Sequence, residues 1–171
     1  MELSQSERLI LYNQYEILKQ FTKDKHDIKH YEAVQTVLQS GYTRNYDIFC
    51  SHIREEELES EKMNYVYDVL DMFRLLSDSF DELNAPEKEL IHSLDISFLG
   101  FDGNEESEYL GYADFIINSL GAYSENKRPN LNSHAPTLWR YDKMLSQLRK
   151  ITENETYRLL TLNEIKQVIK R

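Results

Sequence analysis

The longest regular pattern in this chain is helical. Between residues 63 and 83 the apolar side chains recur at steps of three and four, at Met63, Val66, Leu70, Phe73, Leu76, Phe80 and Leu83. This spacing places all of them on one face of an α-helix. Only 5 glycines and 3 prolines interrupt the chain, whereas turn-rich sandwiches and barrels use many more. The sequence therefore predicts an all-α fold.

Similar apolar stripes, punctuated by capping signals, fill most of the remaining sequence. Three segments read as capping boxes, in which a side chain at each end satisfies a free backbone N–H: Ser4-x-x-Glu7, Asp102-x-x-Glu105 and Thr161-x-x-Glu164. Further signals are Asp27 as a helix N-cap, Gly41 and Gly121 as helix ends, and Pro136 as a first helical residue. We expect a short helix within 43–53, an extended connector over 90–101 and a loop over 122–135. The expected fold is a single compact multi-helix domain over residues 1–171, with about six to seven helices and no substantial sheet.

The formal charge of −10 is unevenly distributed along the chain. Residues 1–40 carry 6 acidic and 5 basic side chains, a net of −1. Residues 41–121 carry 19 and 5, a net of −14, and residues 122–171 carry 5 and 10, a net of +5. The acidic middle repels phosphate backbones, which makes nucleic-acid binding unlikely. Opposite blocks can satisfy each other within one chain or between subunits, and the 12 tyrosines are a residue type enriched at interfaces. We therefore expect a homo-oligomer and leave a separate protein partner possible.

Cellular location is indicated by what the sequence lacks. Cys50 is the only cysteine and cannot form an intramolecular disulfide, which fits a reducing compartment. No apolar run approaches the length of a membrane span, and the first thirty residues do not read as a signal peptide. We expect an acidic, cytoplasmic protein without membrane contact.

Two pairs of residues could carry chemistry. His26 and His30 lie four apart, so a helix would place both imidazoles on one face, but a zinc site needs three or four protein ligands. Arg128-x5-His134 resembles the Arg-x(4–6)-His pattern of HEPN-type ribonucleases, in which the arginine steadies a phosphate and the histidine moves a proton. Pro129 prevents that pair from lying within a regular helix. We predict no catalytic residue, no metal and no cofactor, and keep a metal-independent ribonuclease as an alternative.

A third possibility is a small-ligand binding module. Gly111 lies inside a predicted helix, where it costs about 1 kcal/mol relative to alanine, so another helix or a ligand would be expected to approach there. The pocket would lie near Gly111, Phe101 and Trp139. Asn13 and Gln14 interrupt an apolar helix with two amides, which could hydrogen-bond across a helix pair or a subunit contact.

Ordered sequence blocks identify a family resemblance. They are Arg8-Leu9-Ile10-Leu11, Asn13-Gln14-Tyr15, Phe98-Leu99-Gly100-Phe101-Asp102, Tyr109-Leu110-Gly111-Tyr112, Trp139-x-Tyr141, Met144-Leu145 and Asn163-Glu164-Ile165. In these blocks the chain resembles the YfbU family of small bacterial proteins, nearly end to end. The resemblance implies a helical, cytoplasmic protein and implies no particular reaction. Our reading of the sequence is a non-enzymatic helical interaction protein of the YfbU type.

Overall fold

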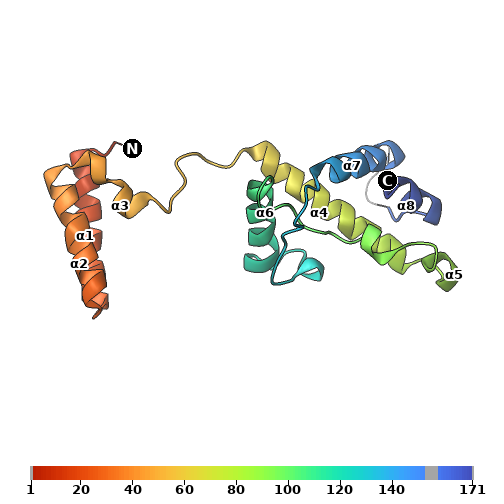
Figure 1. Ribbon diagram of the computed structural model, residues 1–171, viewed down its shortest axis with the longest axis horizontal. Helices are drawn as coiled ribbons and strands as arrows, with labels where there is room; N and C mark the ends of the chain where they lie inside the picture. The colour runs from red at the N-terminus through yellow and green to blue at the C-terminus, as the bar shows by residue number, and fades with distance from the viewer. Residues whose placement is uncertain (1, 153–157, 171) are drawn as a thin grey trace. The chain divides into compact units, whose positions relative to one another are not determined.

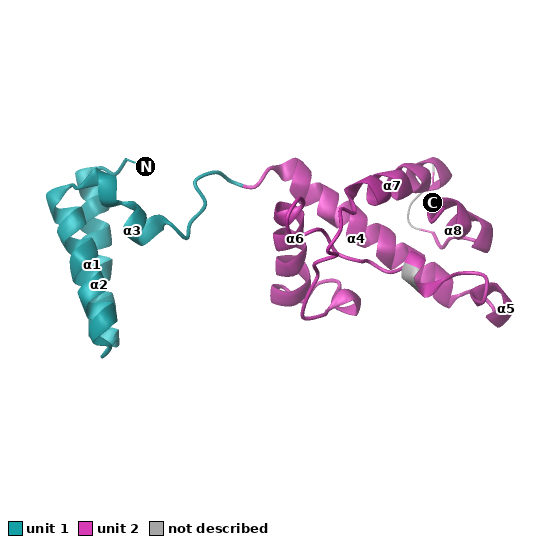
Figure 2. Cartoon of the chain, in the orientation of Figure 1, with its two compact units in different colours: residues 1–57 teal, residues 58–171 magenta. Residues whose placement is uncertain are grey.

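The computed structural model describes residues 2–152 and 158–170 and divides the chain into two compact units, which are residues 1–57 and 58–171 (Figure 2). The α-helices are α1 (Gln5–Phe21), α2 (Lys25–Ser40), α3 (Asp47–Cys50), α4 (Ser60–Asp81), α5 (Ala85–Lys88), α6 (Ser107–Asp114), α7 (Leu138–Thr152) and α8 (Leu162–Val168). Among the described residues the only β-pairing is an isolated parallel bridge between Phe101 and Asn132. The all-α prediction is confirmed. The prediction of a single domain stays a prediction.

The first unit is a helical hairpin of α1 and α2, followed by α3 (Figure 1). Its buried apolar residues come from α2, from α3 and from the turn between them: Val34, Val37, Leu38, Tyr46 and Phe49. The α1 helix contributes no buried side chain. Its partly buried residues Leu11, Tyr12 and Tyr15 pack against this core.

The ends of these two helices confirm two predicted caps and correct a third. The Ser4 and Glu7 side chains form a capping box at the start of α1, and Gly41 ends α2 at a φ of 69°. The N-cap of α2 is Asp24, whose Oδ1 accepts the His26 N–H at 2.7 Å, so the prediction of Asp27 was wrong. Asp27 instead accepts the Thr22 hydroxyl at 3.0 Å across the hairpin turn. A sequence pattern does not distinguish Asp24 from Asp27 as the N-cap, because the two aspartates lie only three residues apart.

The second unit is organised around α4, the long helix that α6, α7 and α8 contact (Figure 1). At its centre lie four aromatic rings that are almost fully buried: Phe73, Phe98, Phe101 and Tyr141. The Phe73 and Tyr141 rings lie edge to face with centroids 5.2 Å apart, a preferred aromatic geometry. After α6 the helix continues as a π-helical turn, Phe115–Ser119, and Gly121 closes it at a φ of 73°.

Two predicted helix starts in this unit were shifted. The sequence suggested that Asp102 and Glu105 form a capping box, but α6 begins at Ser107 and the carboxylate that reaches back to the Asp102 N–H is that of Glu106. Pro136 was predicted as a first helical residue, yet α7 begins at Leu138. In both places contacts with distant residues decide where the helix begins. None of the described helices is both long and apolar enough to cross a bilayer.

Candidate functional site

The buried carboxylate of Glu106 joins two segments of the second unit, one at Asp102 and one at Thr137 and Leu138. Its Oε1 accepts the backbone N–H groups of Thr137 and Leu138 at 2.7 and 2.9 Å, and its Oε2 accepts the Asp102 N–H at 2.9 Å. The Thr137 hydroxyl lies 2.9 Å from Oε2 and 3.0 Å from the Gly100 carbonyl oxygen, either of which accepts its proton. The donors supplied by the chain surround this carboxylate, so it acts as a cap for α7.

The backbone at Gly100, beside this carboxylate, passes very close to the backbone at Leu131. Gly100 has a φ of 94°, and a Cβ atom there would lie 1.6 Å from the Leu131 carbonyl oxygen. The Tyr141 hydroxyl donates to the Gly100 carbonyl at 2.9 Å and accepts the Leu99 N–H at 3.2 Å. Burial raises the pKa of Tyr141 to about 12, which keeps its hydroxyl protonated at neutral pH. The Tyr141 side chain therefore connects α7 to the backbone at Leu99 and Gly100.

A surface groove of about 890 Å³ lies between α4 and α7. The Tyr65 hydroxyl donates to Asp142 at 2.7 Å within it, and Arg149 pairs with Asp68 at 2.8 Å. Burial and the adjacent Asp142 carboxylate raise the pKa of Tyr65. These four side chains form two pairs, Tyr65 with Asp142 and Arg149 with Asp68. Each of them already has a partner within the chain, so none of the four stands free to act as an acid, a base or a nucleophile.

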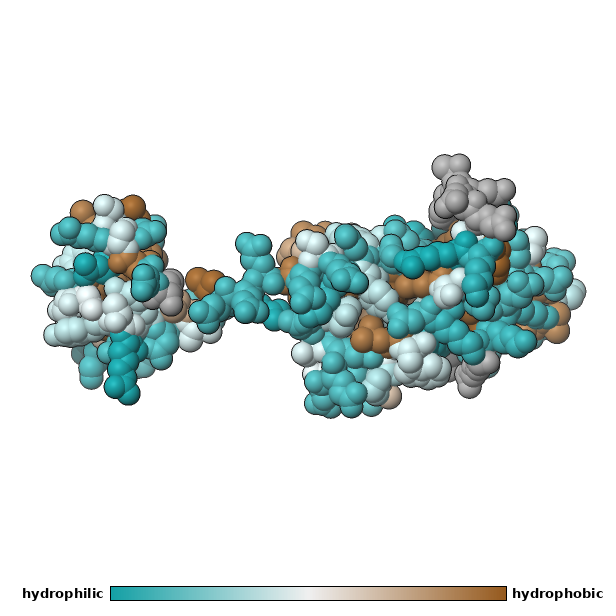
Figure 3. Space-filling model, turned by 90° about the horizontal axis from the view of Figure 1, so that it is seen from above, coloured by the Kyte–Doolittle hydropathy of each residue, from teal (hydrophilic) through white to brown (hydrophobic). Residues whose placement is uncertain are grey.

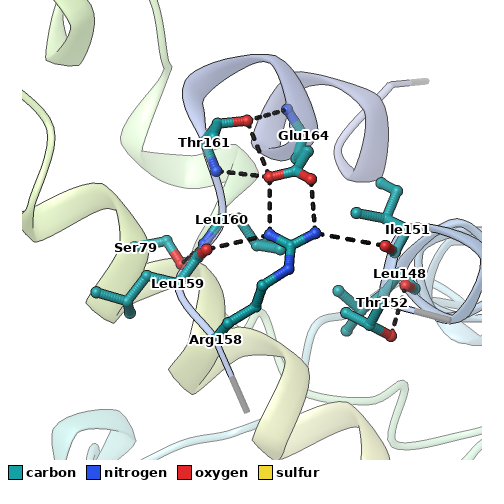
Figure 4. A network of polar contacts seen from close by, with 9 residues as sticks. All are labelled: Ser79, Leu148, Ile151, Thr152, Arg158, Leu159, Leu160, Thr161 and Glu164. Carbon is teal, nitrogen blue, oxygen red and sulfur yellow. Dashed lines mark hydrogen bonds and ion pairs between the residues drawn. The ribbon is translucent and has the colours of Figure 1, made fainter. Parts of the chain in front are cut away.

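A polar network ties α8 to α4 and α7 (Figure 4). The Arg158 guanidinium binds both carboxylate oxygens of Glu164, at 2.7 and 3.1 Å, and Thr161 completes the capping box of α8. The Ser79 hydroxyl donates to the Leu75 carbonyl and accepts the Leu160 N–H at 2.9 Å. This network closes the end of the second unit and confirms the predicted third capping box.

Aromatic side chains also gather on the surface of the second unit. Tyr67 lies edge to face with Tyr112 at 6.0 Å, and Tyr112 stacks on Phe115 at 6.3 Å. Figure 3 shows exposed hydrophobic residues on both units. Phe115 is 46% exposed, so this group offers an apolar surface of modest size.

The most exposed apolar surface of any described helix belongs to α1. Ile10 and Ile17 are each 57% exposed and Phe21 is 83% exposed. With Asn13 and Gln14, which are also exposed, they lie on one face of the helix, because their spacings are three, four and seven residues. We call these five residues the α1 stripe.

The opposite face of α1 holds the helix against α2. The Gln35 amide donates to Glu16 at 2.9 Å, and the Arg8 guanidinium donates to the Leu38 carbonyl at 3.1 Å. The Tyr15 and Tyr31 rings lie 5.6 Å apart. These contacts fix the orientation of α1, so its stripe faces away from the hairpin.

The predicted ribonuclease pair lies in the loop before α7. Arg128 donates to the Asn130 carbonyl at 3.1 Å, and the His134 N–H is held by the Asn132 side chain at 2.8 Å. His134 is exposed and has a left-handed φ of 57°. Each residue is explained by local loop structure, and a joint role in RNA cleavage stays a prediction.

The histidine pair and the cysteine lie in the first unit. His26 and His30 are exposed one turn apart on α2, and no group of three possible metal ligands occurs among the described residues. Cys50 is half-buried, and its thiol donates to the Tyr46 carbonyl.

The residues of the predicted small-ligand pocket differ in their surroundings within the part of the chain that the structure describes. Phe101 is fully buried, whereas Trp139 is exposed and lines a shallow pocket of about 200 Å³ with Lys143 and Ile169. Gly111 is exposed, and a Cβ atom there would meet nothing within 4 Å among the described residues. The prediction that another helix closely approaches Gly111 was therefore wrong for this structure.

Sequence reasoning missed Glu106 and the stripe on α1. Glu106 was overlooked because its donors lie about thirty residues further along the chain, which no local pattern reveals. The stripe had a visible signal, since Ile10, Ile17 and Phe21 recur at steps of seven and four. Leu11, Tyr15, Leu18 and Phe21 form a second, overlapping apolar pattern at steps of four, three and three, and the sequence alone does not show which of the two faces packs against α2.

Two comparisons relate the chain to known proteins. The family model described as the YfbU domain matches residues 1–171. A protein of Methanocaldococcus jannaschii, named UPF0304 protein MJECS11, is 35% identical over 162 residues, which cover 92% of this chain and 93% of that protein. Neither name states a reaction, a ligand or a partner.

Proposed function

Because the chain belongs to the YfbU family and this membership assigns it no reaction, we propose that it is a non-enzymatic helical interaction protein that assembles as a homo-oligomer. The single observation that carries the proposal is α1. It is a helix of 17 residues without a buried side chain, yet it exposes Ile10, Ile17 and Phe21. Large apolar side chains gathered on one exposed face typically mark a surface that binds another protein.

The small core of the first unit supports the same proposal. Five buried apolar residues form the core of a unit of 57 residues. A unit of this size buries a smaller fraction of its surface than a larger domain does, and association is one way in which small units gain stability. Contact with a second copy would bury apolar side chains of α1, the helix that contributes no buried side chain to this unit.

The polar groups of the second unit favour a structural role over catalysis. Glu106 caps α7, and Tyr141 donates a hydrogen bond to the Gly100 carbonyl. Arg158 forms an ion pair with Glu164 at the start of α8. Each of these groups is satisfied by another part of the chain. A catalytic acid or base would instead need a free position facing a substrate.

Sedimentation equilibrium of the complete chain tests the proposal. We expect a reversible rise of the weight-average mass above 20.4 kDa as the protein concentration increases through tens of micromolar. A mass that stays at 20.4 kDa throughout this range would contradict the proposal.

A further inference from the structure

We propose that the α1 stripe is the contact between two copies of this chain, with α1 of one copy packed against α1 of the other. This inference rests on the proposed homo-oligomer and names its surface. It requires no other macromolecule, because each copy presents the same five residues and a two-fold contact buries the same patch on both subunits.

The spacing of the stripe fits a helix pair. Ile10, Gln14, Ile17 and Phe21 follow one another at steps of four, three and four, which is the spacing of a seam between two helices. They span eleven helical steps, or about 16 Å along the helix axis. All four side chains are exposed over this length.

Charge favours a second copy as the occupant of the stripe. The chain carries a net charge of −10, so two copies repel each other over most of their surface. The stripe contains no charged side chain, and residues 1–40 have a net charge of only −1, against −14 for residues 41–121. The α1 helix itself carries two acidic and two basic side chains, so two copies of this helix meet without net charge repulsion.

The two amides add a polar element to this seam. Asn13 and Gln14 are exposed, and among the described residues neither side chain makes a hydrogen bond. A polar residue within an apolar helix seam reduces affinity and specifies how two helices align, provided that it finds a polar partner. A second copy supplies such partners, namely its own amides.

The expected area is modest. A standard interface buries about 800 Å² on each partner, and one face of a single helix offers less than this. We therefore expect reversible association with a micromolar dissociation constant, which is accessible to sedimentation velocity.

The test compares matched charge substitutions. Ile17→Asp places a charge in the stripe, whereas Leu90→Asp places one at an equally exposed leucine of the second unit; the two side chains are 57% and 60% exposed. We expect Ile17→Asp to weaken association by at least about tenfold while Leu90→Asp remains near the wild type. Far-UV circular dichroism of both variants reports whether the helices are retained.

A third variant changes association in the opposite direction. Gln14→Leu removes a polar group from the seam, and we expect it to tighten the dimer by about tenfold, a result that loss of folding cannot produce. A monomeric wild type would refute the homo-oligomer itself. An oligomeric wild type whose mass is unchanged by Ile17→Asp and Gln14→Leu would overturn the α1 contact alone. Equal losses in Ile17→Asp and Leu90→Asp would also overturn it.

Discussion

Glu106 caps a helix that begins 32 residues further along the chain: its Oε1 accepts the Leu138 N–H at 2.9 Å. Glu106 is only 3% exposed, and its carboxylate lies at the positive end of the α7 dipole. One side chain thus connects the start of α6 to the start of α7. The arrangement of the second unit depends on this connection.

Glu106→Ala should therefore be strongly destabilising. The substitution leaves buried N–H groups of Thr137, Leu138 and Asp102 without acceptors, which we expect to lower the free energy of unfolding by about 3 kcal/mol. Urea denaturation measures this loss. Glu105→Ala is the matched control, because Glu105 is an exposed neighbour and its removal should cost less than about 0.5 kcal/mol. Equal effects of the two variants would show that the cap is unimportant.

Three of the glycines should respond to alanine in different ways. Gly100→Ala brings a Cβ atom to 1.6 Å from the Leu131 carbonyl oxygen at a φ of 94°, so we expect a loss of more than about 3 kcal/mol. Gly103→Ala meets the flexible Asn132 side chain at 2.5 Å and should cost less. Gly111→Ala meets nothing within 4 Å among the described residues and should stabilise the helix by up to about 1 kcal/mol. Thermal unfolding of the three variants gives the order, and a destabilised Gly111→Ala protein would mean that this helix face is occupied.

Acid should weaken the ion pair between Arg158 and Glu164 at the start of α8. The Arg158 guanidinium and the Thr161 N–H lower the pKa of Glu164 to about 2, from an ordinary value of 4.5. The unfolded chain therefore binds this proton first as the pH falls. The contribution of the pair is complete above pH 4.5 and is lost between pH 4.5 and 2.

The matched variant for this effect is Glu164→Gln, which cannot titrate. Its urea midpoint should fall less steeply than that of the wild type between pH 4.5 and 2, while the other acidic groups titrate in both proteins. If the urea midpoints of the two proteins fall in parallel as the pH decreases, Glu164 does not contribute to the acid destabilisation.

Local signals in the sequence predicted much of the helical structure. The periodic run over residues 63–83 became α4, and the capping boxes at Ser4 and Thr161 have the expected hydrogen bonds. These features succeeded because every interacting residue lies within one or two helical turns. Gly41 succeeded for the same reason, since a left-handed φ is a local requirement.

Features that depend on distant residues were missed or shifted. The start of α6 moved to Ser107 because Glu106 turns toward Thr137, and the extended connector pairs through Phe101 with Asn132, 31 residues away. Gly100 lets the chain pass beside Leu131, which lies 31 residues further along the sequence. A single sequence does not encode such pairings in its local spacing.

Disulfide cross-linking at the stripe tests the central claim most directly. In a Cys50→Ser background, Gln14→Cys places a thiol in the proposed seam, and Ala33→Cys places one at an exposed position on α2. Mild oxidation at tens of micromolar protein should convert most of the Gln14→Cys chain to a covalent dimer and leave the Ala33→Cys chain monomeric. Equal yields from the two positions, or no dimer from Gln14→Cys, would contradict assembly through α1.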